Sequence, residues 1–354
     1  MKISVYLVLV SLIFTGCSNK ENNVVVINLE QHNRPTELSI PLNEIAETIR
    51  IIPLNTPDSI VIGYISTAKQ FQDKLYIIAS GKVFAFDKDG KFLNAIGTEG
   101  RGPQEYVYPS FIFLRDNSVW VVDDSQKKIL QYSSQGVFED SFSFREKQPL
   151  AAEFHMLKNG TFISFTPDMA QPETDMMLAF FDKKGITDSI MHLNPITEKI
   201  SNQLFLYGEV QFADNKENVR FKHMFNDTIY RIDNYKLVPE FALDLGNRKA
   251  DSEHRRMSLT NTSYNLFDHM DRVDMYGAGS WYLLFKTNGK PFYYDILKKE
   301  VYQWYFELPK DSAIAIDALK RFVPRYIDGN DNLIGWVELA KEDDNPVIII
   351  AKLK

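Results

Sequence analysis

Residues 118–138 read SVWVVDDSQKKILQYSSQGVF, and this stretch decides the fold. It contains two short apolar runs, at 119–123 and 129–132, each of the length and composition of one β-strand. The turn Ser133-Ser134-Gln135-Gly136 follows the second run, and a glycine at its last position is typical of a hairpin that ends in a left-handed residue. The stretch therefore predicts consecutive antiparallel strands joined by tight turns.

The same device recurs along the chain. Turns at 87–90 and 182–185 also end in glycine, so the three glycines stand at 90, 136 and 185, and looser copies without glycine lie at 232–235 and 294–297. An upstream strand precedes each copy, and the predicted ones lie at 75–79, 119–123, 161–165, 219–221 and 281–285, with a sixth copy at 333–339 and 346–353. A period of about 40 to 50 residues with several strands per unit is typical of propeller blades.

The sequence thus predicts an all-β fold: a six-bladed β-propeller over residues 24–354 with short helical or loop insertions. We expect N- and C-terminal strands to close the ring, since strands at 24–29 and 49–54 precede the first clear unit and closure removes exposed sheet edges. Insertions are expected at 249–274 and 317–322, where the alternation of strands breaks down. A β-sandwich with extra hairpins is the alternative arrangement.

The N-terminal segment predicts export and a lipid anchor. Lys2 precedes an apolar run at 3–14 that is too short to span a bilayer, so residues 1–16 are interpreted as a signal peptide. Phe14-Thr15-Gly16-Cys17 resembles the bacterial lipobox, which implies that Cys17 carries the lipid and that residues 17–23 form a polar tether. Cys17 is the single cysteine, so an intramolecular disulfide is excluded. We expect an outer-membrane location, with the periplasmic face favoured over the cell surface.

Two segments resemble a known repeat family. Residues 118–136 resemble the NHL repeat, and the glycine-rich residues 96–106 are similar to the segment between blades in the same superfamily. Together with the lipobox and Ile52-Pro53-Leu54, the chain resembles the six-bladed β-propeller lipoproteins of anaerobic Gram-negative bacteria. That resemblance implies a propeller fold without implying an activity.

Composition and motifs narrow the function. Lys and Arg total 40 against 47 for Asp and Glu, a net charge of −7 without a basic stripe, so we exclude nucleic acid as a partner. The HExxH, GxSxG and CxxC signatures of hydrolases, metalloenzymes and redox proteins do not occur. The six histidines do not recur at the repeat period, which argues against a metal held by one histidine per blade. We therefore expect a binding role rather than a catalytic one.

The glycine-rich segment supplies the candidate site. Arg101, Glu105, Tyr106 and Tyr108 are predicted to lie at the mouth of the central channel, because loops held by a rigid ring often bind ligands. In the alternative interpretation the glycines only permit a tight crossover between blades, and Arg101 pairs locally with Glu105. Asp123 ends a strand and is either a weak metal candidate or a cap of the following turn.

These residues lead to two functional hypotheses. The first is a cofactor-free binding or scaffolding module for a glycan or an envelope protein, in which the aromatic side chains of Tyr106, Tyr108, Trp120 and Trp281 stack on sugar rings. The second, implied by other six-bladed propellers, is a calcium-dependent hydrolase or lyase that uses the channel. Sensitivity to a chelator separates the two.

Overall fold

The structure is a computed structural model of the 354-residue chain. It describes residues 24–30, 40–146, 148, 151–167, 176–192, 208–214, 218–249, 251–278, 281–286, 291–295, 300–303, 306–307, 322, 324–337 and 345–354.

The first three sheets each consist of four consecutive antiparallel strands, and we number the sheets in chain order. Sheet 1 contains β4 (Ile65–Phe71), β5 (Lys74–Ala79), β6 (Lys82–Asp87) and β7 (Phe92–Ala95). Sheet 2 contains β8 (Pro109–Arg115), β9 (Ser118–Asp123), β10 (Lys128–Ser133) and β11 (Phe138–Ser143). Sheet 3 contains β12 (Phe154–Met156), β13 (Phe162–Phe165), β14 (Met176–Asp182) and β15 (Gly185–Met191).

The remaining sheets incorporate the N-terminal strands. Sheet 4 contains β16 (Val210–Asp214), β17 (Val219–His223), β18 (Thr228–Asp233), β19 (Lys236–Asp244) and β1 (Val25–Asn28). Sheet 5 contains β20 (Val273–Ala278), β21 (Trp281–Lys286), β22 (Pro291–Asp295) and β23 (Glu300–Gln303). Sheet 6 contains β25 (Tyr326–Ile327), β26 (Asn332–Val337), β27 (Val347–Leu353) and β3 (Ala46–Pro53). A two-stranded ribbon pairs β2 (Ile40–Pro41) with β24 (Phe306–Glu307).

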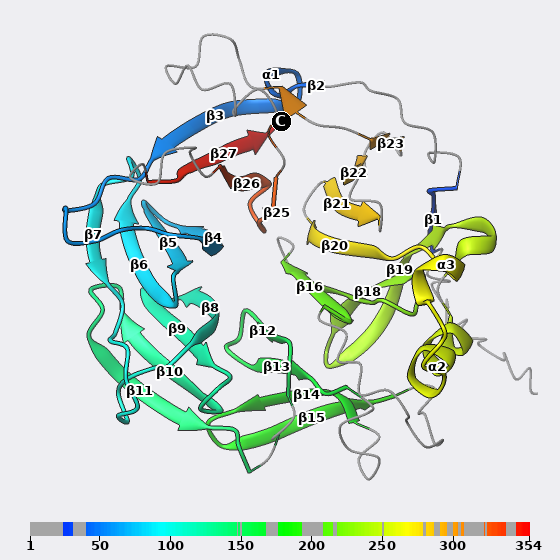
Figure 1. Ribbon diagram of the computed structural model, residues 1–354, viewed down its shortest axis with the longest axis horizontal. Helices are drawn as coiled ribbons and strands as arrows, with labels where there is room; N and C mark the ends of the chain where they lie inside the picture. Colours follow the sequence, from blue (N-terminus) through cyan, green and yellow to red (C-terminus); the bar gives the residue numbers. More distant parts are fainter. Residues whose placement is uncertain are drawn as a thin grey trace, which may run out of the picture.

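The sheets follow one another around a central axis, and the first strand of each sheet lies innermost (Figure 1). These inner strands are β4, β8, β12, β16, β20 and β25. We call the end of the axis at which the inner strands begin the start face, and the end at which they finish the end face. The predicted all-β propeller is confirmed by this arrangement, and the sandwich alternative is not.

Apolar clusters fill the seams between neighbouring sheets. One cluster joins sheets 1 and 2 through residues such as Tyr76, Val83 and Val121. Another joins sheets 3 and 4 through Phe180 and Phe221, and both side chains are almost fully buried. Each sheet therefore buries its faces against its neighbours, which explains why one unit cannot be stable alone.

Gly90 and Gly136 are placed in turns as predicted and also have a second role, whereas Gly185 is the first residue of β15 and has a φ of 143°. Gly90 and Gly136 have φ of 86° and 82°, in the left-handed region that favours glycine. A Cβ atom at Gly136 would fall on the carbonyl oxygen of Ala95 in sheet 1, and one at Gly90 would fall on that of Pro53 in sheet 6. Each turn thus packs closely against the preceding sheet.

The ring is closed by one of the two N-terminal strands, as predicted. β3 pairs antiparallel with β27, as expected for one of them, while β1 pairs parallel with β19 at the outer edge of sheet 4. The prediction of six blades is corrected, because the structure has five blades. Five sheets contain four strands that are consecutive in the chain, and the remaining sheet is a composite of the two ends of the chain.

A helical insertion separates sheets 4 and 5, as predicted for residues 249–274. It comprises the 3-10 helix Gly246–Arg248, α2 (Ser252–Thr260) and α3 (Leu266–His269). Asp251 caps α2, because its side chain accepts the backbone N–H of His254 at 2.9 Å. A short helix, α1 (Leu42–Ile45), precedes β3. Most of the second predicted insertion, at 317–322, lies outside the described residues.

Candidate functional site

Tyr106 is a core residue, which corrects its predicted place at the channel mouth. Its side chain is 1% exposed in the seam between sheets 1 and 2. The hydroxyl donates to the carbonyl of Ile96 at 2.9 Å and accepts the N–H of Val83 at 3.1 Å. Burial raises the pKa of Tyr106. Since its hydrogen bonds are used within the core, this tyrosine does not present itself to a ligand.

Glu105 serves the crossover between sheets 1 and 2. Its carboxylate accepts the N–H of Gly102 at 2.8 Å, and backbone hydrogen bonds join Gly100 to Tyr106. Arg101 is exposed, and no ion pair joins it to Glu105 among the described residues. The tight crossover of the alternative interpretation is therefore observed, with backbone hydrogen bonds in place of the expected ion pair.

Asp123 is a buried turn cap. It is 0% exposed, and its carboxylate accepts hydrogen bonds from the Val107 N–H at 2.6 Å, the Ser125 hydroxyl at 2.6 Å and the Gln126 N–H at 3.0 Å. Burial alone would raise the pKa of Asp123, but these hydrogen bonds outweigh it and lower the pKa. The described residues contain no group of three or more His, Cys, Asp or Glu arranged for a metal ion.

Two other predicted stacking residues do not reach a described binding surface. Trp120 packs edge-on against Phe162 at 5.6 Å in the seam between sheets 2 and 3. The side chain of Trp281 lies outside the described residues, as does Cys17 with the whole segment before residue 24.

Tyr108 is exposed at the start face. Its exposed fraction is 57%, and it immediately precedes the inner strand β8. Tyr64 holds the same position before β4 on the neighbouring sheet and is 70% exposed. The residues that precede the six inner strands are Tyr64, Tyr108, Glu153, Glu209, Arg272 and Arg325. Each of these residues therefore stands at the same position relative to its inner strand. In chain order, they are two aromatic, two acidic and two basic residues.

Glu153 and Arg272 of this ring are held by a hydrogen-bond network. Arg272 donates to Asp274 through Nε at 2.7 Å and to the carbonyl of Gly208 at 3.0 Å. The N–H of Gly208 in turn donates to Glu153. Burial raises the pKa of Glu153, and the Gly208 N–H and Arg272 partly offset that effect. Sheets 3, 4 and 5 are thus joined near the axis by a charged, half-buried cluster.

Glu209 is the buried member of the ring. It lies beside the imidazole Nε2 of His223 at 3.2 Å and the Nε of Arg255 at 3.1 Å. Burial alone would raise the pKa of Glu209, but His223 and Arg255 lower it to about 2. The N–H of Phe225 donates to Nδ1 of His223 at 3.2 Å, so the imidazole proton lies on Nε2, facing the carboxylate.

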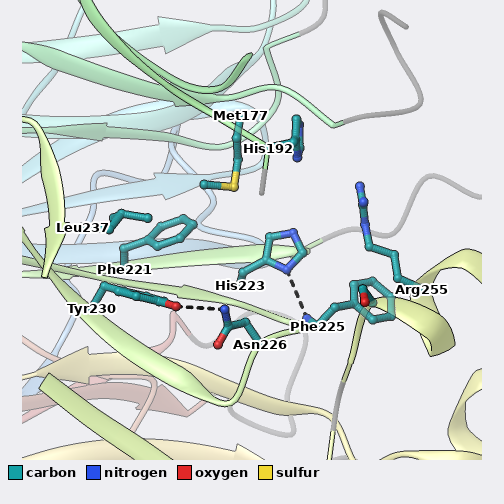
Figure 2. Close-up of a pocket in the computed structure, with 10 residues that line it drawn as sticks. Met177, His192, Phe221, His223, Phe225, Asn226, Tyr230, Leu237 and Arg255 are labelled. Atoms are coloured by element: carbon teal, nitrogen blue, oxygen red, sulfur yellow. Dashed lines mark hydrogen bonds between the residues drawn. The ribbon is translucent and has the colours of Figure 1, made fainter. Parts of the chain in front are cut away.

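A cavity of about 80 Å³ opens beside this ion pair, in the seam between sheets 3 and 4 (Figure 2). Several of its polar side chains are bonded to one another or to backbone. Asn226 donates to the Tyr230 hydroxyl at 2.9 Å and accepts the Thr228 N–H at 2.8 Å, and His192 lies 3.0 Å from the Thr166 carbonyl. The described contacts of this cavity therefore stabilise the seam and the seating of α2.

The sequence did not predict Tyr64, Glu153, Glu209, Arg272 or Arg325 as members of one surface. The available signal was positional: each of them stands one residue before an inner strand. Because the inner strands were not recognised, their starting points could not be aligned.

The fold and this ring define the class of protein as a β-propeller with a charged and aromatic face around its axis. The family model that matches residues 24–352 is described as a domain of unknown function, DUF4934, and the chain belongs to that family. No curated protein matches the chain. The comparisons give no support for the NHL part of the predicted resemblance.

Solved structures confirm the fold. A putative exported protein from Bacteroides fragilis is 16% identical with a TM-score of 0.65, and the match covers 93% of this chain and 100% of that one. A member of the DUF4221 family from Bacteroides vulgatus is 13% identical with a TM-score of 0.50, covering 88% and 97%. Within the described part of the chain, no helix has the length and apolar character needed to cross a bilayer.

Proposed function

We propose that the protein is a cell-envelope propeller that binds a glycan on its start face. One observation carries the proposal: Tyr64 and Tyr108 occupy equivalent positions on adjacent sheets and are 70% and 57% exposed. Large aromatic side chains are usually buried, so two exposed rings at one register favour a recognition surface. Aromatic faces offer apolar area with few rotatable bonds, which suits stacking against sugar rings.

The neighbouring charged residues support the same function. Glu153 and Arg272 lie on sheets 3 and 5 at the start face, where they are held by Gly208. Carboxylate and guanidinium groups fixed in this way bind hydroxyl groups at little entropic cost. Arg325 completes the ring on sheet 6, with its guanidinium 5.4 Å from the ring of Trp336. The start face thus combines stacking surfaces with prepositioned donors and acceptors.

The proposal includes the anchor. Lipidation of Cys17 after removal of residues 1–16 would hold the protein at the outer membrane, with the periplasmic face favoured. The calcium-dependent hydrolase or lyase is the alternative function, and Asp123 is unsuited to a calcium site because its carboxylate is already used as a cap.

Binding to polysaccharides tests the proposal. The full chain in detergent is compared with its Tyr64→Ala and Tyr108→Ala variants in co-sedimentation with xylan, mannan, amylose and peptidoglycan. We expect one of these polymers to bind, and each substitution to weaken binding about tenfold, the factor that corresponds to a loss of about 1.4 kcal/mol. Phe267→Ala, which removes a 39% exposed ring on α3, is the matched control and should leave binding unchanged.

Two results would overturn the proposal. Binding that is equally strong in the tyrosine variants would place the site elsewhere, and capture of an envelope protein without affinity for any polymer would make the partner a protein. Binding or hydrolysis that is lost with EDTA and restored by calcium would instead support the calcium-dependent alternative.

A further inference from the structure

A second cavity lies on the opposite side of the molecule, at the end face. It measures about 220 Å³ and sits between the β12–β13 turn of sheet 3 and the turns of sheet 4. Its polar lining consists of Lys158, Asn159, Asp214, Asn218, Asn234 and Tyr235. We call this cavity the end-face groove. Its volume is below the roughly 300–1,000 Å³ of sites for drug-sized ligands, so a compact ligand fits it.

Asp214 is the fixed acceptor of the groove. Its carboxylate lies 3.0 Å from Nε2 of His155, and 51% of its side chain remains exposed. The surrounding protein would raise the pKa of Asp214, but His155, Lys69 and Lys158 lower it to about 2. The carboxylate is therefore ionised at neutral pH and accepts hydrogen bonds without donating any.

Inner strands of four successive sheets hold this acceptor in place. The Nζ of Lys69 lies 5.0 Å from the centre of the Phe113 ring, and Phe113 packs edge-on against His155 at 5.8 Å. His155 stacks on Phe212 at 5.6 Å with an interplanar angle of 24°. Because β4, β8, β12 and β16 each supply one member, Asp214 is positioned by the rigid part of the fold.

Tyr235 is kept in the groove at an energetic cost. It stands in the turn between β18 and β19 with φ of 61°, and Asn234 beside it has φ of 48°. In sheets 1 and 2 the turns before the outer strands carry Gly90 and Gly136 in the same left-handed region. A side chain there costs about 1–2 kcal/mol relative to glycine. The ring of Tyr235 packs on Phe180 at 5.0 Å and also lines the groove.

The charges of the groove favour one ligand charge. Among the described residues, Lys69 and Lys158 both act electrostatically on a single carboxylate, that of Asp214, and Nε2 of His155 lies 3.0 Å from it. Two lysines beside one carboxylate leave an excess of positive charge, which a negatively charged ligand would neutralise. Asp214 and the three asparagine amides are suited to hydroxyl groups, and Tyr235 offers an apolar surface.

We propose that the end-face groove binds an acidic sugar residue, with its carboxylate toward Lys158 and its hydroxyl groups toward Asp214 and the asparagines. This site goes beyond the proposed function and shares with it only the chemical class of ligand. The two sites lie on opposite faces, so they are separable by mutation.

Calorimetric titration of the full chain in detergent tests this proposal. The probes are glucuronate and galacturonate, their neutral counterparts glucose and galactose, and acetate. We expect the uronates to bind at least tenfold more tightly than the neutral sugars or acetate. Lys158→Met should remove that preference, because Lys158 is exposed and its loss leaves the core intact, while Lys88→Met is the matched control on a distant exposed lysine.

Further variants connect the result to Asp214 and separate it from the start face. Asp214→Asn should weaken all sugars, and its thermal unfolding should first show that it is folded. Tyr64→Ala and Tyr108→Ala should leave uronate binding unchanged. A result that contradicts glycan binding at the start face is thereby distinguished from one that contradicts uronate binding in the end-face groove. Equal affinity for glucose and glucuronate, equal affinity for acetate and glucuronate, or no binding of any probe would each overturn the proposal.

Discussion

Tyr106 and Tyr108 stand two positions apart and have opposite environments. The first is 1% exposed and has both hydrogen-bonding roles of its hydroxyl filled, whereas the second is 57% exposed before an inner strand. Residue type and spacing alone do not tell a core tyrosine from a ligand-binding one. The hydrogen-bond partners of each hydroxyl group show which tyrosine is structural. By the same criterion, Asp123 is structural because it caps its turn, and Glu209 is structural because it holds Arg255 of α2.

Tyr106→Phe should destabilise the protein. The substitution removes one hydroxyl and leaves the Val83 N–H and the Ile96 carbonyl without that partner in the core. We expect a loss of about 1–3 kcal/mol in the free energy of unfolding, measured by urea denaturation. Tyr108→Phe is the control and should unfold like the parent chain. Identical curves for both variants would show that the buried hydroxyl contributes nothing.

The turns between strands act as contacts between neighbouring sheets. Gly136 lies against the backbone of β7 in the preceding sheet, and Gly90 lies against β3 in the same manner. Glycine is therefore needed at these turns for two reasons, the left-handed φ and the space for a neighbouring carbonyl. Gly81 has a φ of 74° but open space around it, so it satisfies the first condition alone.

Gly136→Ala should cost more than Gly81→Ala. We expect about 1–2 kcal/mol of left-handed strain in each variant, and a further 1–3 kcal/mol at Gly136 from displacement of β7. Parallel urea denaturation of the two proteins measures the difference. Equal destabilisation would mean that the contact with sheet 1 relaxes without cost.

The elements that were predicted from sequence share a signal that the others lack. Strands such as β9 and β10 are apolar and end at a glycine turn, so their position was predictable. The turns that follow the inner strands β4 and β8 contain no glycine. Their left-handed residues are Gln72, Asp116 and Asn117, with φ of 54°, 50° and 62°. Their starting residues, and hence the ring on the start face, could not be aligned from sequence. The end-face groove also needed the fold, since Lys69, His155 and Asp214 are distant in the chain.

At the scale of the whole molecule, the two ends of the chain share one core. Ile52 on β3 packs with Ile348 and Ile350 on β27 and with Phe86 of sheet 1. Sheet 6 is therefore complete only when residues from the beginning and the end of the chain meet. Such closure leaves no free edge on β27 and couples the stability of the first and last sheets.

Ile52→Ala should lower the stability of the whole chain. Its side chain is 4% exposed, and truncation at such a site costs about 2–5 kcal/mol. One cooperative urea transition, shifted to lower concentration, is the expected outcome. Val26→Ala on β1 is the control, because Val26 is 63% exposed and its loss should change stability by less than about 0.5 kcal/mol. A second, separate transition would show that the sheets unfold independently.

The parallel strand β1 determines where the molecule is held. It is the outermost strand of sheet 4, at the circumference of the molecule (Figure 1). An anchor at Cys17, as proposed, is joined by residues 17–23, which reach at most about 25 Å at roughly 3.5 Å per residue. A linker of that length would keep the outer edge of sheet 4 close to the bilayer, with the propeller axis parallel to the membrane. Neither the start face nor the end face would then lie against lipid, so both would stay accessible to ligands.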